Sequence, residues 1–202
     1  MVGIKLLNAL LGFATVTVFA RHLPPEKYGV YILAITIAQF LALPLQLGVP
    51  TLLVREIAIA TAQAHPGLVR GVQIWSRRVI ALGTLGLGAA VIGGYALVLA
   101  AGWPILKNFD WPMILMIVAL IPVIAEMKRA MGALTGFKLA AYGLLPDGAV
   151  RPFLLFVLGA LGLTLWDISE RELLGVYLGS ALAAATVGTW LLRRCQPIAS
   201  VA

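Results

Sequence analysis

Charged residues are scarce in this chain of 202 residues. Only 11% are Asp, Glu, Lys or Arg, whereas 61% are hydrophobic, and the mean hydropathy is +1.01. Soluble domains carry roughly 25% charged residues, because their surface must face water. The shortage of charge excludes an ordinary soluble domain and predicts an integral membrane protein.

Residues that carry most catalytic and metal chemistry are also rare. Cys195 is the single cysteine, so no intrachain disulfide can form, and the two histidines, His22 and His65, border proline-containing turns. The sequence has no zinc-ligand spacing, phosphate-binding glycine loop, serine-nucleophile motif or carboxylate pair within an apolar run. We therefore predict no catalytic residue, no metal site and no cofactor, and a protein that is not an enzyme.

The basic residues do not gather into one face or arm. The formal net charge is +7, but lysines and arginines are scattered between apolar runs, which argues against nucleic-acid binding. The runs themselves approach the ~20 residues that a helix needs to cross a hydrocarbon core of ~30 Å. We expect an all-α polytopic membrane protein, a single transmembrane domain over residues 1–202, with six helices at approximately 4–20, 28–48, 79–101, 112–134, 150–166 and 173–192.

Several local features shape this prediction. The first run could be a signal peptide, but Arg-His-Leu-Pro follows it in place of a small-residue cleavage site, which favours a retained helix. Pro44 predicts a kink in the second helix, either facing a polar cavity or only shaping its packing. Residues 142–147 are expected to form a turn before the fifth helix. Two stripes of small residues at spacing four predict close helix packing; they are Gly86, Ala90 and Gly94, and Gly175, Gly179 and Ala183.

The distribution of basic residues predicts an orientation. With six spans, eleven of the fifteen Lys and Arg residues fall on the side of the two termini, and four fall on the other side: Arg21, Lys27, Lys107 and Arg171. Because cytoplasmic loops are enriched in Lys and Arg, both termini are expected to be cytoplasmic.

Ionisable residues that continue apolar helices are the candidates for function, since burying a charge in a bilayer requires a partner or water. Many such side chains simply reach the interface from a helix end, and Glu126 and Arg151 stand out because each extends an apolar helix. The ionisable candidates are Arg21, Arg55, Glu56, Glu126, Lys128, Arg129, Asp147 and Arg151. Those predicted to bind substrate or to gate are Arg21, Arg55, Glu126, Lys128, Arg129 and Arg151.

Short motifs along the whole chain resemble one transporter family. Ala-Arg-His-Leu-Pro-Pro-Glu-Lys-Tyr-Gly at 20–29 is similar to the "AR-LGPEEYG" signature of polysaccharide-export flippases. These belong to the multidrug/oligosaccharidyl-lipid/polysaccharide exporter superfamily. Pro24 stands where glycine is usual. Similar segments are Leu47-Gly48-Val49-Pro50 with Arg55-Glu56, residues 131–137, and Val150-Arg151-Pro152.

The resemblance implies a role and its partners. Family members resemble two six-helix lobes around a central cavity, and this chain resembles the N-terminal lobe. The implied role is flipping of a lipid-linked oligosaccharide across a bacterial or archaeal plasma (inner) membrane, with a second lobe or a second copy as partner. The alternatives are half of a drug or metabolite antiporter, which requires an ion-coupling acid within a span, and a non-transporting scaffold of polysaccharide assembly. An inactive truncated product is a further alternative.

Overall fold

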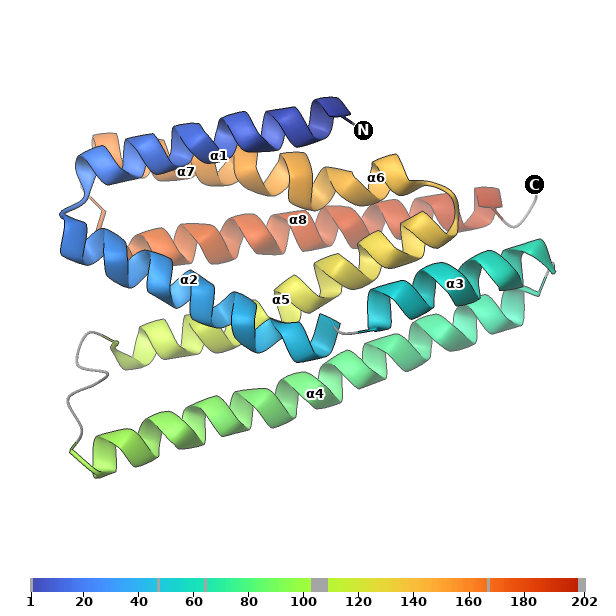
Figure 1. Ribbon diagram of the computed structural model, residues 1–202, viewed down its shortest axis with the longest axis horizontal. Helices are drawn as coiled ribbons and strands as arrows, with labels where there is room; N and C mark the ends of the chain where they lie inside the picture. The colour runs from blue at the N-terminus through green and yellow to red at the C-terminus, as the bar shows by residue number, and fades with distance from the viewer. Residues whose placement is uncertain (1, 47, 64, 103–108, 167, 200–202) are drawn as a thin grey trace.

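The prediction of an all-α polytopic membrane protein is confirmed. The computed structural model describes residues 2–46, 48–63, 65–102, 109–166 and 168–199, and these contain helices and no strand. Figure 1 shows an elongated bundle whose helices run roughly along its long axis. They are α1 (Val2–His22), α2 (Pro25–Gln46), α3 (Val49–Ala62), α4 (Pro66–Ala100), α5 (Trp111–Gly136), α6 (Ala140–Leu145), the π-helix η2 (Pro146–Val150), α7 (Arg151–Leu165) and α8 (Glu170–Ala199).

Six helical segments are long and apolar enough to cross a bilayer, as the sequence predicts. These candidate spans are Val2–His22, Pro25–Gln46, Pro66–Ala100, Trp111–Gly136, Ala140–Leu165 and Glu170–Cys195. Their ends differ from the predicted ranges, most of all in α4, whose 35 residues begin thirteen residues before the predicted position 79. At 1.5 Å per residue, α4 is about 50 Å long and exceeds the hydrocarbon core of a bilayer.

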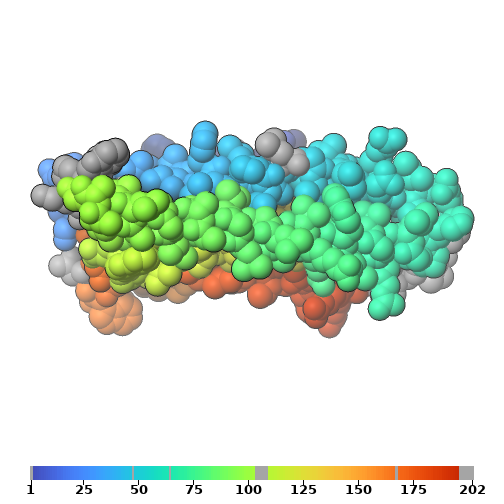
Figure 2. Space-filling view, turned by 90° about the horizontal axis from the view of Figure 1, so that it is seen from below, coloured from blue at the N-terminus to red at the C-terminus, as the bar shows by residue number. Residues whose placement is uncertain are grey.

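Helix α5 is the centre of the bundle. Half of an 18-residue apolar stretch of α5 is buried, against 11% of the corresponding stretches of α1 and α4. The side chains of Ile117, Leu120, Ile121 and Leu134 on α5 are almost completely inaccessible. Helices α2, α3, α4 and α8 all pack on α5, whereas α1 packs mainly on α7. Figure 2 shows α4 lying along one face of the molecule from end to end.

The outer faces of the helices are apolar. Val2, Phe13, Leu82 and Leu97 are each more than 70% exposed and lie on α1 and α4. A surface of this kind would be unstable in water, but it matches the acyl chains of a bilayer. The fold is therefore that of a chain whose external solvent is lipid.

The second predicted helix, at about 28–48, is α2, and a separate helix follows it. Helix α2 ends at Gln46, two residues beyond Pro44, and α3 begins at Val49 after Gly48, whose φ is +85°. Because L side chains disfavour this left-handed conformation, glycine is suited to the break. Proline removes a backbone donor just upstream, which weakens the last turn of α2. Pro44 thus stays inside α2, the two helices part between Gln46 and Val49, and residues 49–62 are a helix of their own.

The predicted turn at residues 142–147 is wrong. The structure has α6, η2 and α7 in direct succession, so the fifth span is helical from Ala140 to Leu165. Pro146 sits at the start of the π-helical turn. A π-helical turn inserts an extra residue into a helix, and such turns occur frequently at functional sites. The consequence is that Asp147 lies inside a span.

The small-residue stripes bring helices no closer than ordinary contact, which a Cβ added at Gly175 would make with Met116 Cε of α5 at 3.9 Å. A Cβ added at Gly86, Gly94 or Gly179 would meet no heavy atom of the described chain within 4 Å. Close packing occurs instead at Gly132, where an added Cβ would lie 2.8 Å from the Cα and the carbonyl oxygen of Pro50. Glycine at this position lets α5 approach the first turn of α3.

We therefore expect Gly132→Ala to destabilise the protein by about 1–3 kcal/mol, the usual cost of overpacking, because the atoms it meets belong to backbone. The measurement is the midpoint of thermal unfolding in detergent. Gly93→Ala is the control, since nothing lies within 4 Å of its added Cβ. Equal stabilities of the two variants would contradict the close approach at Gly132.

The two termini lie at one end of the bundle, and two ion pairs lie at the other. Helix α1 begins and α8 ends at one end, where the α3–α4 and α5–α6 connections also lie (Figure 1). At the opposite end, Lys27 is 3.7 Å from Glu170, and Arg171 forms an ion pair with Asp110. Lys107 of the predicted outer side and Leu47 of the quoted motif lie outside the described residues.

Candidate functional site

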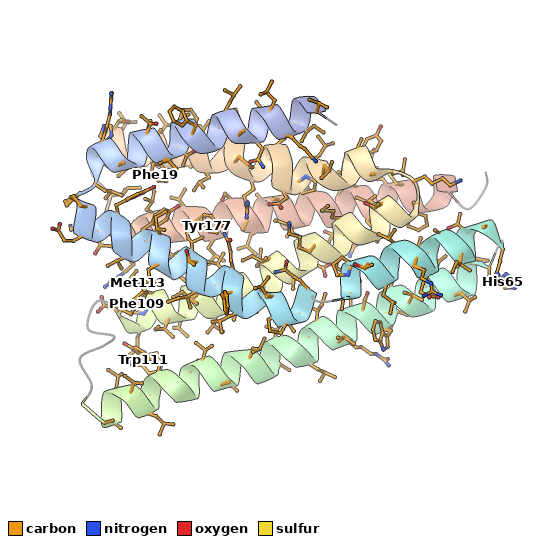
Figure 3. All side chains as sticks on the ribbon, in the orientation of Figure 1. Phe19, His65, Phe109, Trp111, Met113 and Tyr177 are labelled. Carbon is orange, nitrogen blue, oxygen red and sulfur yellow. The ribbon has the colours of Figure 1, made fainter. Side chains whose placement is uncertain are left out.

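Five polar side chains from four spans form a connected cluster inside the bundle. We call it the polar cluster; its members are Gln39 of α2, Lys128 of α5, Asp147 of η2, Arg151 of α7 and Tyr177 of α8. Figure 3 shows Tyr177 between Phe109 at one end of the bundle and His65 at the other. The cluster joins helices that are far apart in the sequence.

Asp147 is the centre of the polar cluster. Its Oδ2 accepts a hydrogen bond of 2.7 Å from the Lys128 ammonium group, and its Oδ1 lies 2.9 Å from Arg151 Nη2. The second contact is an ion pair without hydrogen-bond geometry, because Oδ1 has no hydrogen-bond partner among the described residues. One carboxylate thus bridges two cations that come from different helices.

Tyr177 provides the other support for Arg151. Arg151 Nη1 donates a hydrogen bond of 3.1 Å to the Tyr177 hydroxyl, and its guanidinium carbon lies 5.6 Å from the centre of the tyrosine ring. Gln39 Nε2 donates to the same hydroxyl at 3.3 Å. Tyr177 thus holds the guanidinium group through Nη1, whereas Asp147 contacts Nη2.

The polar cluster is partly open and carries excess positive charge. The exposed fractions of the side chains are 34% for Lys128, 24% for Asp147 and 21% for Arg151. Two cations and one carboxylate leave a formal charge of +1. A charge within a membrane span needs a counter-ion or access to water, so this arrangement is suited to attract an anionic group.

Glu126 and Arg129 form a second ion pair on α5. Arg129 donates from Nε and Nη2 to the two carboxylate oxygens of Glu126, at 2.7 and 2.6 Å. Its side chain is fully buried, whereas that of Glu126 is 27% exposed. Its remaining nitrogen, Nη1, has no hydrogen-bond partner among the described residues. Such a bidentate pair is strong, and it neutralises a cation that could not otherwise stay in the interior.

The six predicted site residues therefore divide into groups. Lys128 and Arg151 come together around Asp147, and Glu126 pairs with Arg129. Arg21 in the last turn of α1 and Arg55 on α3 are exposed, and neither forms an ion pair with a described residue.

Gln39 and Tyr177 complete the cluster but are not among the predicted site residues. Asp147 is one of the ionisable candidates that the sequence indicates, but it is not among the predicted substrate-binding or gating residues. The spacing of four between Asp147 and Arg151 is a signal for a helical ion pair, but the turn expected at residues 142–147 separates the two residues in the prediction. No sequence signal connects Tyr177 to these residues.

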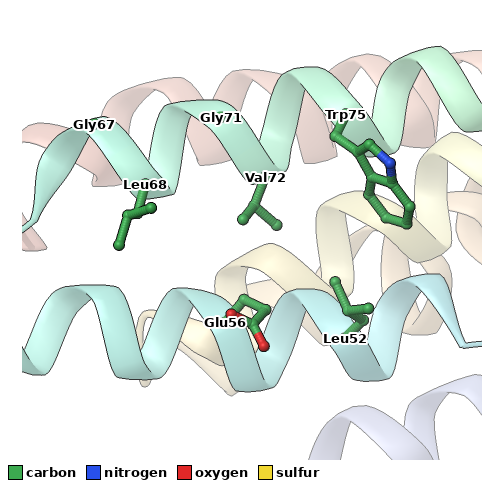
Figure 4. A pocket seen from close by; sticks show the side chains of 7 residues that line it. All are labelled: Leu52, Glu56, Gly67, Leu68, Gly71, Val72 and Trp75. Carbon is green, nitrogen blue, oxygen red and sulfur yellow. The ribbon is translucent and has the colours of Figure 1, made fainter.

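An apolar groove lies apart from the polar cluster, between α3 and α4. Figure 4 shows its lining, which consists of Leu52, Glu56, Gly67, Leu68, Gly71, Val72 and Trp75. Its volume is about 380 Å³. Glu56 is the one ionisable group in this lining, so the groove lacks the paired charges that distinguish the polar cluster. Among the residues that the structure describes, no three His, Cys, Asp or Glu side chains gather as metal ligands would.

Comparison with known proteins agrees with the sequence resemblance. A family described as "Polysaccharide biosynthesis protein" has a model that matches residues 1–196, which is nearly the whole chain. No curated protein matches the chain, and no solved structure does.

Proposed function

Because the chain belongs to the polysaccharide biosynthesis protein family, we propose that it helps to move a lipid-linked saccharide precursor across the membrane. The observation that carries this proposal is the polar cluster, in which Lys128 and Arg151 lie on either side of one carboxylate inside candidate spans. A saccharide linked to a lipid through phosphate is anionic and amphipathic. Its transfer needs a cationic contact within the apolar thickness of the bilayer.

Each member of the polar cluster has a role in this proposal. The Arg151 guanidinium group presents several donors in one plane and is suited to bind phosphate oxygens in pairs, whereas Lys128 acts as a point charge. Tyr177 and Gln39 orient Arg151. Arg21, Arg55, Glu126 and Arg129 are more distant candidates, as contacts during passage or as gating residues.

We further propose that the chain acts with a second six-helix lobe or a second copy of itself. Helices α1 and α2 diverge from their shared turn (Figure 1), and both have exposed faces. Two lobes that rock about a site between them provide alternating access. In this arrangement the polar cluster would be reached from the face between α1 and α2.

The proposed location is the plasma (inner) membrane of a bacterium or archaeon, with both termini in the cytoplasm. Cys195 tests this orientation, because it is the single cysteine and lies half-buried near the end of α8. We expect a membrane-impermeant maleimide to label Cys195 in inverted vesicles but not in intact cells. In the matched control, Cys195→Ser with Ser169→Cys moves the thiol to the opposite end and should reverse the pattern. Labelling of Cys195 from outside would contradict the orientation.

One alternative gains support from the position of Asp147. Half of a drug or metabolite antiporter requires an acid within a span, and Asp147 lies within the helical segment from Ala140 to Leu165. The substrate separates the two functions: an antiporter half moves a small soluble molecule in exchange for an ion, and a flippase moves a lipid. A scaffold of polysaccharide assembly would move neither.

A cellular experiment tests the proposed function. We expect cells without this chain to lose surface polysaccharide and to accumulate its lipid-linked precursor in the cytoplasmic leaflet, because synthesis continues while transfer stops. The measurement is mass spectrometry of extracted lipids. Loss of the precursor together with the polysaccharide would contradict transfer and favour a role in synthesis or assembly.

A further inference from the structure

We propose that Asp147 is an internal counter-ion that occupies the place of the substrate phosphate between Lys128 and Arg151. An incoming phosphate group exchanges with the Asp147 carboxylate, and the carboxylate returns when the lipid leaves. This inference rests on the proposed function and adds to it the regulation of the same site. Asp147 is a positioning residue, because it acts on the two cations and not on the lipid.

The geometry of the bridge supports the exchange. The Asp147 carboxylate places one oxygen 2.7 Å from Lys128 Nζ and the other 2.9 Å from Arg151 Nη2. A phosphate group also presents several anionic oxygens and forms strong bonds with lysine and arginine donors. The distances show that two cations from separate helices already stand at the spacing that one small anion can bridge.

Arg151 has contacts that remain when the Asp147 carboxylate is replaced by a phosphate group. Its bond of 3.1 Å to the Tyr177 hydroxyl, and its position against the tyrosine ring, do not depend on Asp147. Tyr177 is in turn held by Gln39 from α2. When the carboxylate leaves, the guanidinium group keeps its place.

The backbone around Asp147 departs from regular α-helix, and we infer that the carboxylate moves with it. Asp147 lies in the π-helical turn Pro146–Val150, next to Gly148. Pro146 has no N–H, and a π-helical turn is a local departure from regular α-helix. Gly148 faces Ile4 of α1, whose Cγ2 would lie 2.8 Å from an added Cβ. A shift of this turn would therefore change its contact with α1, which is one of the two helices on the proposed substrate face.

Charge favours the same conclusion. With Asp147 in place the three ionised groups carry +1, and without its carboxylate the two cations carry +2. A diphosphate, with at least two negative charges, then neutralises the site more fully than the single carboxylate does. The site should therefore prefer a lipid diphosphate to a neutral lipid of the same chain.

Binding of farnesyl diphosphate to the full chain in nanodiscs tests the proposal, with farnesol as the neutral ligand. We expect Asp147→Asn to lower the Kd for farnesyl diphosphate about tenfold or more, because removal of an internal competitor frees two charge-assisted contacts. Asp110→Asn is the matched control, since Asp110 pairs with Arg171 at the opposite end, and its Kd should stay within about twofold of wild type. Asp147→Glu keeps the competing charge and should bind like the wild type.

Other outcomes would overturn the proposal. An unchanged or raised Kd in Asp147→Asn, or an equal fall in Asp110→Asn, is one such result. A second is transport that depends on pH in the wild type but not in Asp147→Asn, without tighter binding, which would make Asp147 a proton-carrying acid. If Asp147→Asn folds poorly because Lys128 and Arg151 repel each other, farnesyl diphosphate should restore its folded fraction and farnesol should not. Restoration by neither ligand would also overturn the proposal.

The same variants separate this inference from the proposed function. Tighter binding in Asp147→Asn, combined with no movement of lipid-linked saccharide by the wild type either alone or with a second lobe, would refute the function and leave the counter-ion role standing. Movement of lipid-linked saccharide by the wild type, combined with unchanged binding in Asp147→Asn, would support the proposed function and refute the counter-ion role of Asp147.

Discussion

Replacing Glu126 with glutamine is expected to destabilise the protein by about 3–5 kcal/mol, which is the usual cost of removing one charge of a buried ion pair. Arg129 is fully buried, and both of its bonded nitrogens donate to Glu126. Its third nitrogen has no partner among the described residues. A neutral amide in place of the carboxylate would leave a charge in the interior without compensation. The measurement is thermal or chemical unfolding in detergent, followed by tryptophan fluorescence.

Two controls separate this effect from a general loss of charge. Glu170→Gln removes a partner of the exposed Lys27 at a distance of 3.7 Å and should change stability by less than about 1 kcal/mol, as for other surface pairs. The double variant Glu126→Leu with Arg129→Met should recover much of the lost stability, because apolar residues of similar volume can replace a buried pair. A single Glu126→Gln variant as stable as Glu170→Gln would contradict the buried pair.

Replacing Arg151 with glutamine is expected to lower transfer of lipid-linked saccharide by about 10- to 100-fold, in line with the loss of a desolvated charge contact. The variant leaves Asp147 paired with Lys128 alone and removes one of the two donors to the Tyr177 hydroxyl, the other being Gln39. Arg151→Lys keeps the charge but not the planar group of donors, so transfer should fall less. The assay is movement of a fluorescent lipid-linked saccharide in vesicles.

Arg171→Gln is the matched control for Arg151→Gln. Arg171 also pairs with an aspartate, Asp110, but it is 46% exposed and lies at the opposite end of the bundle. Its replacement should leave transfer nearly unchanged. Equal transfer activity of Arg151→Gln and Arg171→Gln, with both variants folded, would contradict the proposal that the polar cluster binds the substrate.

The membrane fold could be predicted from composition and the spacing of apolar runs. A helix that crosses lipid must satisfy its backbone within itself, so a long apolar run almost dictates the element. The local errors occurred where proline and glycine admit more than one structure. Pro146 and Gly148 are residues typical of a turn, whereas the chain remains helical there through a π-helical turn. Gly48 lies two residues beyond the end of α2, and its positive φ allows a new helix, α3, to begin.

The candidate site was only partly predictable for a different reason. Lys128 and Arg151 were identified because charge is rare in a span, and that argument needs only the sequence. Their connection through Asp147 joins residues 19 positions apart on different helices, and Tyr177 adds a helix further along the chain. Likewise, nothing in the apolar stripe around Gly86 distinguishes a face toward lipid from a face toward another helix. The connections within the polar cluster and the orientation of this stripe both depend on tertiary packing.

The most direct test of the proposed function is transbilayer movement by the purified chain in sealed vesicles. A fluorescent saccharide linked through diphosphate to a polyprenyl lipid would be followed by quenching from outside, with the chain alone and together with a co-reconstituted second lobe. We predict faster movement than in protein-free vesicles under at least one of these conditions, and a loss of that movement in Arg151→Gln. Movement no faster than in protein-free vesicles under both conditions would contradict transfer by this chain.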